Sequence, residues 1–368
     1  MFVLYDTKLL YILINAFGIS FVTTYLLVFP IIKLAIRFKI MDIPNQRKVN
    51  KVPIPRMGGL GIVIGTTLGL IYLQPFHEHF GKIAIGAIIV VITGLLDDKF
   101  SLPPLIKLIG QLVPACILFI SGINIERVSF PFFGIVELSL PLSIIITFIW
   151  ILGITNAINL IDGLDGLASG VSTIALCSIL AMAFLDGHLF VIFLCVALIG
   201  SNLGFLIHNF HPAKIYMGDT GSLFLGYSIA VISILGLFKK VTLLGFIIPV
   251  IVLALPIFDT LFAIIRRARN GEKIMKPDKK HIHHQLLSVG LSHRQTVFVM
   301  YGISLIFGIL AIVFSRASMG ILLFIALIVC IMIYFLAEIV GLVGQGRKPV
   351  INSFKKWFFV TKGDNPTK

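Results

Sequence analysis

Long apolar runs alternate with short polar segments along almost the whole chain. Windows of about 19 residues pick out about eleven runs that are apolar enough to cross a membrane. They cover residues 9–36, 57–73, 83–96, 103–121, 143–161, 166–185, 189–207, 222–238, 243–265, 296–315 and 319–343. A helix needs about 20 apolar residues to cross the hydrocarbon core. The pattern therefore predicts an all-α polytopic membrane protein with about eleven transmembrane helices.

The polar segments between these runs divide unequally in charge. With the runs placed as above, 23 Lys and Arg residues fall on one face of the membrane and 6 on the other. Because basic loops stay in the cytoplasm, we expect the N-terminus outside and the C-terminus inside. The weak alternation of apolar and polar residues in 122–142 predicts a short extracytoplasmic β-hairpin.

Composition agrees with this class of protein. Hydrophobic residues make up 58% of the 368 positions, charged residues 12%, and the net charge is +14. In a polytopic protein such a basic excess marks cytoplasmic loops, so we expect no nucleic acid as a partner. Residues 1–343 are assigned to a single transmembrane domain. Residues 344–368 form a basic, aromatic tail, which is expected to lie on the anionic inner leaflet.

Amides and carboxylates interrupt the apolar sequence between the fifth and sixth runs. Asn156 and Asn159 are three positions apart, as are Asp162 and Asp165, so on a helix each pair would share a face. A charge at the bilayer centre costs about 2.5 to 3.5 kcal/mol, and such groups therefore need a partner. Converging oxygens suit a divalent cation, a phosphorylated ligand, or both. The alternative is a plain tight turn between two spans.

Two further acidic positions fall on the same expected cytoplasmic face. Asp97 and Asp98 end the third run, and adjacent like charges raise one another's proton affinity, so one of them could act as a base. The alternative is a stop signal at the membrane surface. Asp219 stands where a helix begins, in the stretch 208–222. A helix N-terminus is a phosphate site; the alternative is that Asp219 or Thr220 is an N-cap and nothing more.

The last cytoplasmic loop is rich in histidine. His281, His283 and His284 lack the regular spacing of a zinc site, and the basic residues beside them favour phosphate recognition. The alternative is a solvated basic loop. Asp259, inside the ninth run, is interpreted as the buried partner of Arg266 or Arg267. The first loop adds a Pro-Arg-Met-Gly-Gly segment at 55–59, which supplies a cation where an anionic group would dock.

Five motifs, in this order, resemble those of the polyprenyl-phosphate N-acetylhexosamine-1-phosphate transferases, and most closely the WecA/TagO type. The motifs are the 55–59 loop, Asp97-Asp98, residues 156–167, residues 217–222, and His281-Ile282-His283-His284. The resemblance extends from Asp42 to about Gly290. It implies transfer of N-acetylglucosamine 1-phosphate from UDP-N-acetylglucosamine to undecaprenyl phosphate in a bacterial inner membrane, with release of UMP. Ile282 interrupts the histidine run, which favours this branch over the phospho-N-acetylmuramoyl-pentapeptide transferases.

The resemblance also implies roles for individual residues. Asp219 would be a ligand of Mg²⁺, or of Mn²⁺ as the alternative, with Asn159 near the metal. Asp97 or Asp98 would deprotonate or position the lipid phosphate, and Asp162 and Asp165 would line the nucleotide or sugar pocket. The remaining residues are expected to bind substrate: Asn156, Asn209, Tyr216, Lys107, Arg266, His281, His283 and His284.

Three alternatives remain open at this point. The donor could be another UDP-N-acetylhexosamine or UDP-N-acetylmuramoyl-pentapeptide. Intramembrane acidic groups would also fit a transporter, although here they cluster at one membrane face. The chain could act alone or as a homodimer. A cation is expected in the enzyme reading, because both reacting groups are anionic and Mg²⁺ would offset their repulsion.

Overall fold

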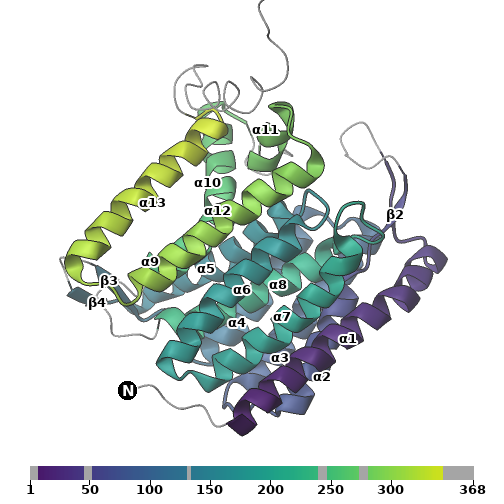
Figure 1. The fold of residues 1–368 in the computed structure, drawn as a ribbon, viewed down its shortest axis with the longest axis horizontal. Helices are drawn as coiled ribbons and strands as arrows, with labels where there is room; N and C mark the ends of the chain where they lie inside the picture. The colour runs from purple at the N-terminus through teal and green to yellow at the C-terminus, as the bar shows by residue number, and fades with distance from the viewer. Residues whose placement is uncertain (1–6, 45–51, 131–133, 239–246, 273–280, 343–368) are drawn as a thin grey trace, which may run out of the picture.

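The computed structural model describes residues 7–44, 52–130, 134–238, 247–272 and 281–342, and these are mostly helical (Figure 1). The N-terminal helices are α1 (Thr7–Arg37), α2 (Gly59–Leu73), α3 (Phe80–Phe100), α4 (Pro104–Ile120), α5 (Leu140–Ile161), α6 (Leu167–Asp186) and α7 (Leu189–Asn209). They are followed by α8 (Gly218–Ser233), the π-helical turn η1 (Ile234–Phe238), α9 (Ile247–Val252), α10 (Ala254–Arg269), α11 (Ile282–Ser288), α12 (His293–Phe314) and α13 (Met319–Ile339).

The expectation of a polytopic helical membrane protein is met. Eight of the described helices are long and apolar enough to cross a membrane, and α2 and α4 are shorter apolar helices. The expected ninth span differs, because the chain there is divided into α9 and α10 on either side of Leu253. The count of eleven and the orientation of the termini stay predictions. The tail 344–368 lies outside the described residues.

Helix α8 is the centre of the fold. Almost all of its side chains are buried, and it packs against α2, α3 and α5. Glycines permit these contacts: a Cβ at Gly59 would lie 2.1 Å from the backbone of Gly221, and one at Gly94 would lie 2.5 Å from Cα of Thr220. Small residues allow membrane helices to approach this closely. The first turn of α8 is thereby held against the start of α2 and the end of α3.

Two small antiparallel sheets complete the described part. Strands β1 (Met41–Asp42) and β2 (Ile54–Pro55) pair beside the start of α2, and Arg56 forms a parallel bridge with Tyr216. Strands β3 (Arg127–Phe130) and β4 (Gly134–Glu137) pair in the segment where a hairpin was expected. The side of the membrane on which β3 and β4 lie stays a prediction.

Candidate functional site

The start of α8 is capped by a carboxylate from another helix. The backbone N–H groups of Asp219 and Thr220 donate to Asp98 at 2.7 and 3.0 Å, and the Thr220 hydroxyl donates to it at 2.6 Å. The side chain of Asp98 is completely buried. A helix N-terminus leaves its first amides unsatisfied and carries partial positive charge. Asp98 accepts hydrogen bonds from these amides, and its negative charge offsets the partial positive charge of the helix end. Its oxygens therefore hold α8 against α3.

Arg56 joins the acidic residues of three segments. Its Nε lies 3.0 Å from Asp98, one Nη lies 2.6 Å from Asp219, and the other lies 4.0 Å from Asp42. The planar guanidinium suits this task because it offers several donors in a fixed geometry. The position of Arg56 is set by the 55–59 loop, where the N–H groups of Gly58 and Gly59 donate to the carbonyls of Tyr216 and Met217.

Lys107 lies on the other side of Asp219. Its ammonium group donates to the second carboxylate oxygen of Asp219 and to Oδ1 of Asn159, the latter at 3.2 Å. Asp97 lies 3.7 Å from the same nitrogen. The amide of Asn159 is oriented because its nitrogen donates to Ser222 at 2.8 Å. One cation thus connects the carboxylates of α3 and α8 with the end of α5.

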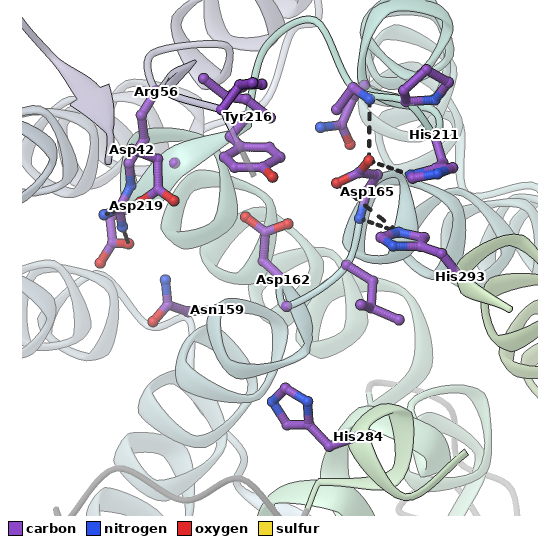
Figure 2. Close-up of a pocket in the computed structure, with 18 residues that line it drawn as sticks. Asp42, Arg56, Asn159, Asp162, Asp165, His211, Tyr216, Asp219, His284 and His293 are labelled. Carbon is purple, nitrogen blue, oxygen red and sulfur yellow. Dashed lines mark hydrogen bonds and ion pairs between the residues drawn. The ribbon is translucent and has the colours of Figure 1, made fainter. Parts of the chain in front are cut away.

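Arg56, Asn159 and Asp219 border a cavity of about 590 Å³ (Figure 2). Asn159 and Asp219 lie on one side of it, and Asp165, His211 and His293 on the other, with Asp162 and Tyr216 between them. Burial raises the pKa of Asp162 to about 7, although Arg56 lowers it. Burial also raises the pKa of Tyr216 above its ordinary value, so its hydroxyl stays a hydrogen-bond donor at neutral pH.

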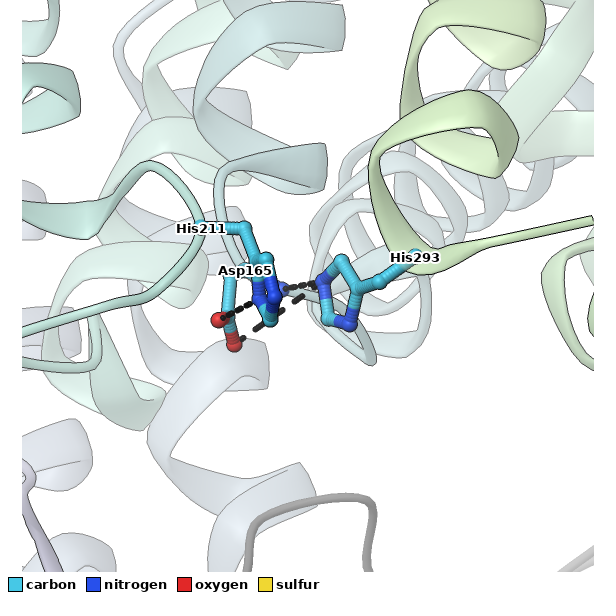
Figure 3. Close-up of side chains that lie close together, drawn as sticks. All are labelled: Asp165, His211 and His293. Carbon is cyan, nitrogen blue, oxygen red and sulfur yellow. Dashed lines mark hydrogen bonds and ion pairs between the residues drawn. The ribbon is translucent and has the colours of Figure 1, made fainter.

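Asp165 is fixed by groups from two other segments (Figure 3). One of its oxygens accepts hydrogen bonds from Nδ1 of His211 at 2.7 Å and from the Ala213 N–H at 3.1 Å. Its own N–H donates to Nε2 of His293 at 3.0 Å, so the proton of that ring is on Nδ1. The two imidazoles stack with centroids 4.1 Å apart. The second carboxylate oxygen of Asp165 lies 4.0 Å from Nε2 of His293.

These three side chains are close enough to suggest a metal site, but the ring geometry favours a hydrogen-bonding role. The two imidazole planes are only 20° apart, so their in-plane lone pairs run side by side and do not converge. Tetrahedral coordination requires the lone pairs to meet at one point. The nitrogen of His293 nearest Asp165 also accepts an amide hydrogen bond. His211 and His293 therefore orient Asp165.

A second cavity, of about 520 Å³, is lined by Lys107, whose ammonium bonds Asp219 and Asn159 in the wall of the first. It is lined by residues from the end of α3, from α4 and from α5, among them Asp97, Lys107, Gln111 and Asn156. Asp97 accepts the N–H of Leu102 at 2.9 Å, and Asn156 donates to Gln111 at 2.7 Å. Lys107 therefore contacts residues of both cavities, Asp97 in the second and Asp219 in the first.

The histidine motif is fixed by Asp259, which corrects the interpretation of that residue. Asp259 accepts hydrogen bonds from Nδ1 of His281 at 3.0 Å and from the N–H of Ile282 at 2.8 Å. It was expected to pair with Arg266 or Arg267. The carboxylate instead lies at the beginning of α11, where it satisfies a helix N–H. It also places His281 inside the protein, because both side chains are almost completely buried.

The other two histidines of the motif have different surroundings. His284 lines the first cavity. His283 is buried, and neither of its ring nitrogens has a hydrogen-bond partner within the described part of the chain. A Cβ at Gly163 would lie 2.5 Å from Nε2 of His283, so this ring packs beneath the turn that presents Asp162. Burial lowers the pKa of His283 to about 3, which keeps the ring neutral.

Comparison with known proteins gives the family. A model of glycosyl transferase family 4 matches residues 80–237. Over 95% of its length the chain is 46% identical to a probable undecaprenyl-phosphate N-acetylglucosaminyl 1-phosphate transferase of Bacillus subtilis, of which it covers 98%. The chain belongs to glycosyl transferase family 4. The resemblance inferred from the five motifs is thereby confirmed.

Two less similar transferases also match the chain. The decaprenyl-phosphate N-acetylglucosaminephosphotransferase of Mycobacterium tuberculosis is 36% identical over 76% of this chain and 77% of its own length. A phospho-N-acetylmuramoyl-pentapeptide-transferase of Listeria monocytogenes is 34% identical over 82% of this chain and 98% of its own length. A transporter is disfavoured, since all three relatives are named as transferases.

The structure brings most of the sequence-predicted residues to these two cavities. The first is lined by Asn159, Asp162, Asp165, Asn209, Tyr216, Asp219 and His284, and the second by Asp97, Lys107 and Asn156. Asp98, His281, His283 and Arg266 lie outside both linings. Asn209 is buried and holds the backbone, because it accepts the N–H of Gly166 and donates to the carbonyl of Ile215.

Sequence reasoning did not single out Arg56, His211, His293 or Asp42 as site residues. Arg56 belongs to the quoted 55–59 motif, so a signal for it was present. His211 stands within the 208–222 stretch, from which Asn209, Tyr216 and Asp219 were predicted as site residues. His293 is nine positions after His284, the last residue of the histidine motif, and reaches Asp165 through the packing of α12 on α6. No local pattern distinguishes it.

The residues around Asp219 suit a divalent cation. Carboxylate and amide oxygens from Asp162, Asn159 and Asp219 face one cavity, and Mg²⁺ takes such oxygens together with those of a substrate. The ammonium of Lys107 bonds both Asp219 and Asn159, and so shows that this position favours positive charge. Coordination of an ion there by Asp219 stays a prediction.

Proposed function

We propose that this protein transfers N-acetylglucosamine 1-phosphate from UDP-N-acetylglucosamine to undecaprenyl phosphate in the bacterial inner membrane, with release of UMP. The observation that carries the proposal is the position of Lys107, which lines the second cavity and bonds Asp219 and Asn159 in the wall of the first. A reaction between a soluble phosphate donor and a lipid-bound phosphate acceptor needs two binding sites that bring the reacting phosphates together. Identity of 46% to the Bacillus subtilis relative supports the same donor and acceptor.

The first cavity suits the nucleotide sugar. It contains an oriented carboxylate at Asp165, a hydroxyl donor at Tyr216 and an imidazole at His284, which together can read the polar edges of a base, ribose or sugar. Its volume of about 590 Å³ is within the usual range of about 300 to 1,000 Å³ for such ligands. The diphosphate would lie toward Asp219, where Arg56 and Lys107 supply positive charge.

The second cavity suits the lipid phosphate. Asp97 lies at the end of a membrane helix and faces this cavity, whereas Asp98 is completely buried beneath α8. We therefore assign to Asp97 the role of positioning the lipid phosphate or accepting its proton, and to Asp98 the role of holding α8. A strong base is unnecessary, since a phosphate monoester is already mostly ionised near pH 7.

The reaction is a displacement at the phosphorus that carries the sugar. An oxygen of undecaprenyl phosphate forms a bond to that phosphorus, and the bond to the bridging oxygen breaks, so that UMP leaves. Arg56 and Lys107 hold the reacting phosphates together, because preorganised positive groups stabilise charge that would otherwise repel. A bound Mg²⁺ would add Lewis-acid stabilisation of the same oxygens.

The test is purified protein with labelled UDP-N-acetylglucosamine and undecaprenyl phosphate. We expect a labelled diphospholipid together with UMP, both lost when a chelator removes divalent cations. A parallel panel with UDP-N-acetylmuramoyl-pentapeptide and UDP-N-acetylgalactosamine measures donor preference. Turnover of another donor in preference would refute the assigned donor, and full turnover in chelator would refute the metal requirement.

A further inference from the structure

A third cavity lies at the other end of the helix bundle. It has a volume of about 750 Å³ and is lined mainly by apolar side chains of α2, α3, α7 and α8. The start of α2 and the end of α3 contact the first turn of α8 beside Asp219. Its lining includes Gln74, Phe76 and Phe80, where α2 ends and α3 begins. The cavity therefore extends to the membrane face opposite the proposed reaction.

The end of the cavity near Gln74 and Phe76 is expected to face lipid. Helix α2 has 15 residues and is about 22 Å long at 1.5 Å per residue, whereas the hydrocarbon core is about 30 Å thick. The end of α2 thus lies below the membrane surface. Phe76 is fully exposed there, and Ile88 and Ile92 farther along α3 are also exposed. The cleft between α2 and α3 is open to the acyl chains of the bilayer.

The interior of the cleft offers little to water or to a polar ligand. The hydroxyl of Thr66 is bonded to Ser201 at 2.6 Å, and that of Thr67 donates to the carbonyl of Val63 at 2.8 Å. The hydroxyl of Tyr227 donates to the carbonyl of Ile83 at 3.1 Å. A buried water needs two to four polar partners; besides these hydroxyls the lining contains two further polar residues, Gln74 and Ser228, and is otherwise apolar. The occupant is therefore apolar.

The end of the cleft where α3 begins carries positive charge. Lys82 is exposed in the first turn of α3, next to Ile83, which lines the cleft. Glu78, in the same loop, pairs with His79 at 3.0 Å. No carboxylate within the described residues forms an ion pair with Lys82. A lysine beside the entrance of an apolar cleft in a bilayer suits the phosphate of a lipid headgroup.

We propose that this cleft binds one acyl chain of an anionic phospholipid from the leaflet opposite the Asp219 cavity, with Lys82 beside the headgroup phosphate. A polyprenyl phosphate that reacts at Asp97 fits less well, because its phosphate would be at the other membrane face. The bound chain fills the space between α2 and α3, both of which pack on α8. The inference rests on the packing of these helices and is independent of the proposed reaction.

Photolabelling in lipid nanodiscs tests the proposal. The nanodiscs contain phosphatidylcholine and a small fraction of phosphatidylglycerol with a diazirine near the end of one acyl chain. We expect labelled peptides to concentrate in α2 and α3. Ala87 lines the cleft, and Ala87→Phe should reduce that labelling several-fold, because the ring occupies the space of the chain. Lys82→Gln should reduce it as well.

Ala326→Phe is the matched control, since Ala326 is exposed on α13 away from the cleft. It should leave the labelling unchanged. Binding of UDP-N-acetylglucosamine, or a cooperative thermal transition if no binding is found, shows that each variant is folded. Equal labelling of all exposed helices, or wild-type labelling of Ala87→Phe, would refute the site. Displacement of the probe by undecaprenyl phosphate but not by unlabelled phosphatidylglycerol would assign the cleft to a polyprenyl chain.

Discussion

Adjacent aspartates can have opposite roles, as Asp97 and Asp98 illustrate. Asp98 accepts two backbone N–H groups and one hydroxyl at the start of α8, and also contacts Arg56. Asp97 faces a cavity and accepts a single N–H from Leu102. The same chemical group therefore serves the fold at one position, and at the next is available to a ligand.

This difference predicts different effects of the same substitution. Asp98→Asn replaces an acceptor oxygen by an amide that faces other donors, and an unsatisfied buried group costs about 1 to 3 kcal/mol or more. We expect a clear drop in the thermal unfolding temperature in detergent. Asp97→Asn should keep that temperature and lower kcat with little change in KM for the UDP-sugar. Equal loss of stability in both variants would contradict the assignment.

The buried imidazole of His283 predicts a dependence of stability on pH. Its pKa is about 3 in the folded protein, against 6.5 for a free imidazole. Below pH 6.5 the unfolded chain therefore binds a proton that the folded protein excludes. Stability is complete above that pH and falls as the pH decreases toward 3.

His283→Leu should weaken this dependence, since leucine has no proton to gain. Thermal unfolding measured at pH 7.5, 6.5 and 5.5 gives the slope of unfolding temperature against pH for each protein, with His188→Leu as a control.

UDP-sugar binding should survive in His283→Leu and be weakened in His284→Ala, by about 1.5 to 3 kcal/mol if a charge-assisted hydrogen bond is lost. Identical slopes for wild type and His283→Leu would count against the burial of a neutral ring.

At the scale of elements, the short helix α11 is held by one residue of α10. Asp259 binds both the N–H of Ile282 and the ring of His281, and His284 reaches the cavity from the same helix. Removing this carboxylate should release α11 and so misplace His284. The expected result for Asp259→Ala is a higher KM for the UDP-sugar with a smaller change in kcat.

Asp259→Asn keeps an oxygen that can accept the N–H of Ile282, and should therefore be milder than Asp259→Ala. Asp186→Asn is a matched control, because Asp186 pairs with Arg316 at 2.9 Å away from both cavities. Steady-state measurements of KM and kcat for the UDP-sugar in Asp259→Ala, Asp259→Asn and Asp186→Asn test this prediction. Unchanged KM in Asp259→Ala would show that α11 is held by other contacts.

The sequence predicts the helices of this protein much better than it predicts which side chains contact one another between helices. Apolar length alone predicts the eight described helices that are long enough to span a membrane, and the polar interruption at Asn159 and Asp162 falls at the candidate site. The partner of Asp259 could not be derived, because helical spacing favours Arg266 whereas the actual partner comes from a separate helix. His293 was missed for the same reason. Contacts between distant segments depend on how helices pack, which hydropathy does not record.

At the scale of the whole molecule, the arrangement of the helices predicts the accessibility of its two ends. Glu78 follows α2 and Lys214 precedes α8, and both are exposed at opposite ends of the bundle. In a background in which Cys116, Cys177, Cys195 and Cys330 are replaced, we expect Glu78→Cys to react with an impermeant maleimide from outside the cell. Lys214→Cys should react only after the membrane is opened. Labelling of both from the same side would contradict the predicted orientation.

The single ammonium group between the two cavities has a consequence for how the substrates bind. Lys107 contacts Asp219 and Asn159 on one side and lies 3.7 Å from Asp97 on the other. A cation or UDP-sugar that binds at Asp219 would release the Lys107 ammonium to contact the acceptor phosphate. An acceptor phosphate that binds the Lys107 ammonium would in turn leave Asp219 free for the cation or donor. Binding at the two sites is then thermodynamically linked, and each ligand must raise the affinity of the other by the same factor. Titration of UDP-sugar with and without a non-reactive lipid phosphonate should show this synergy in the wild type and lose it in Lys107→Met.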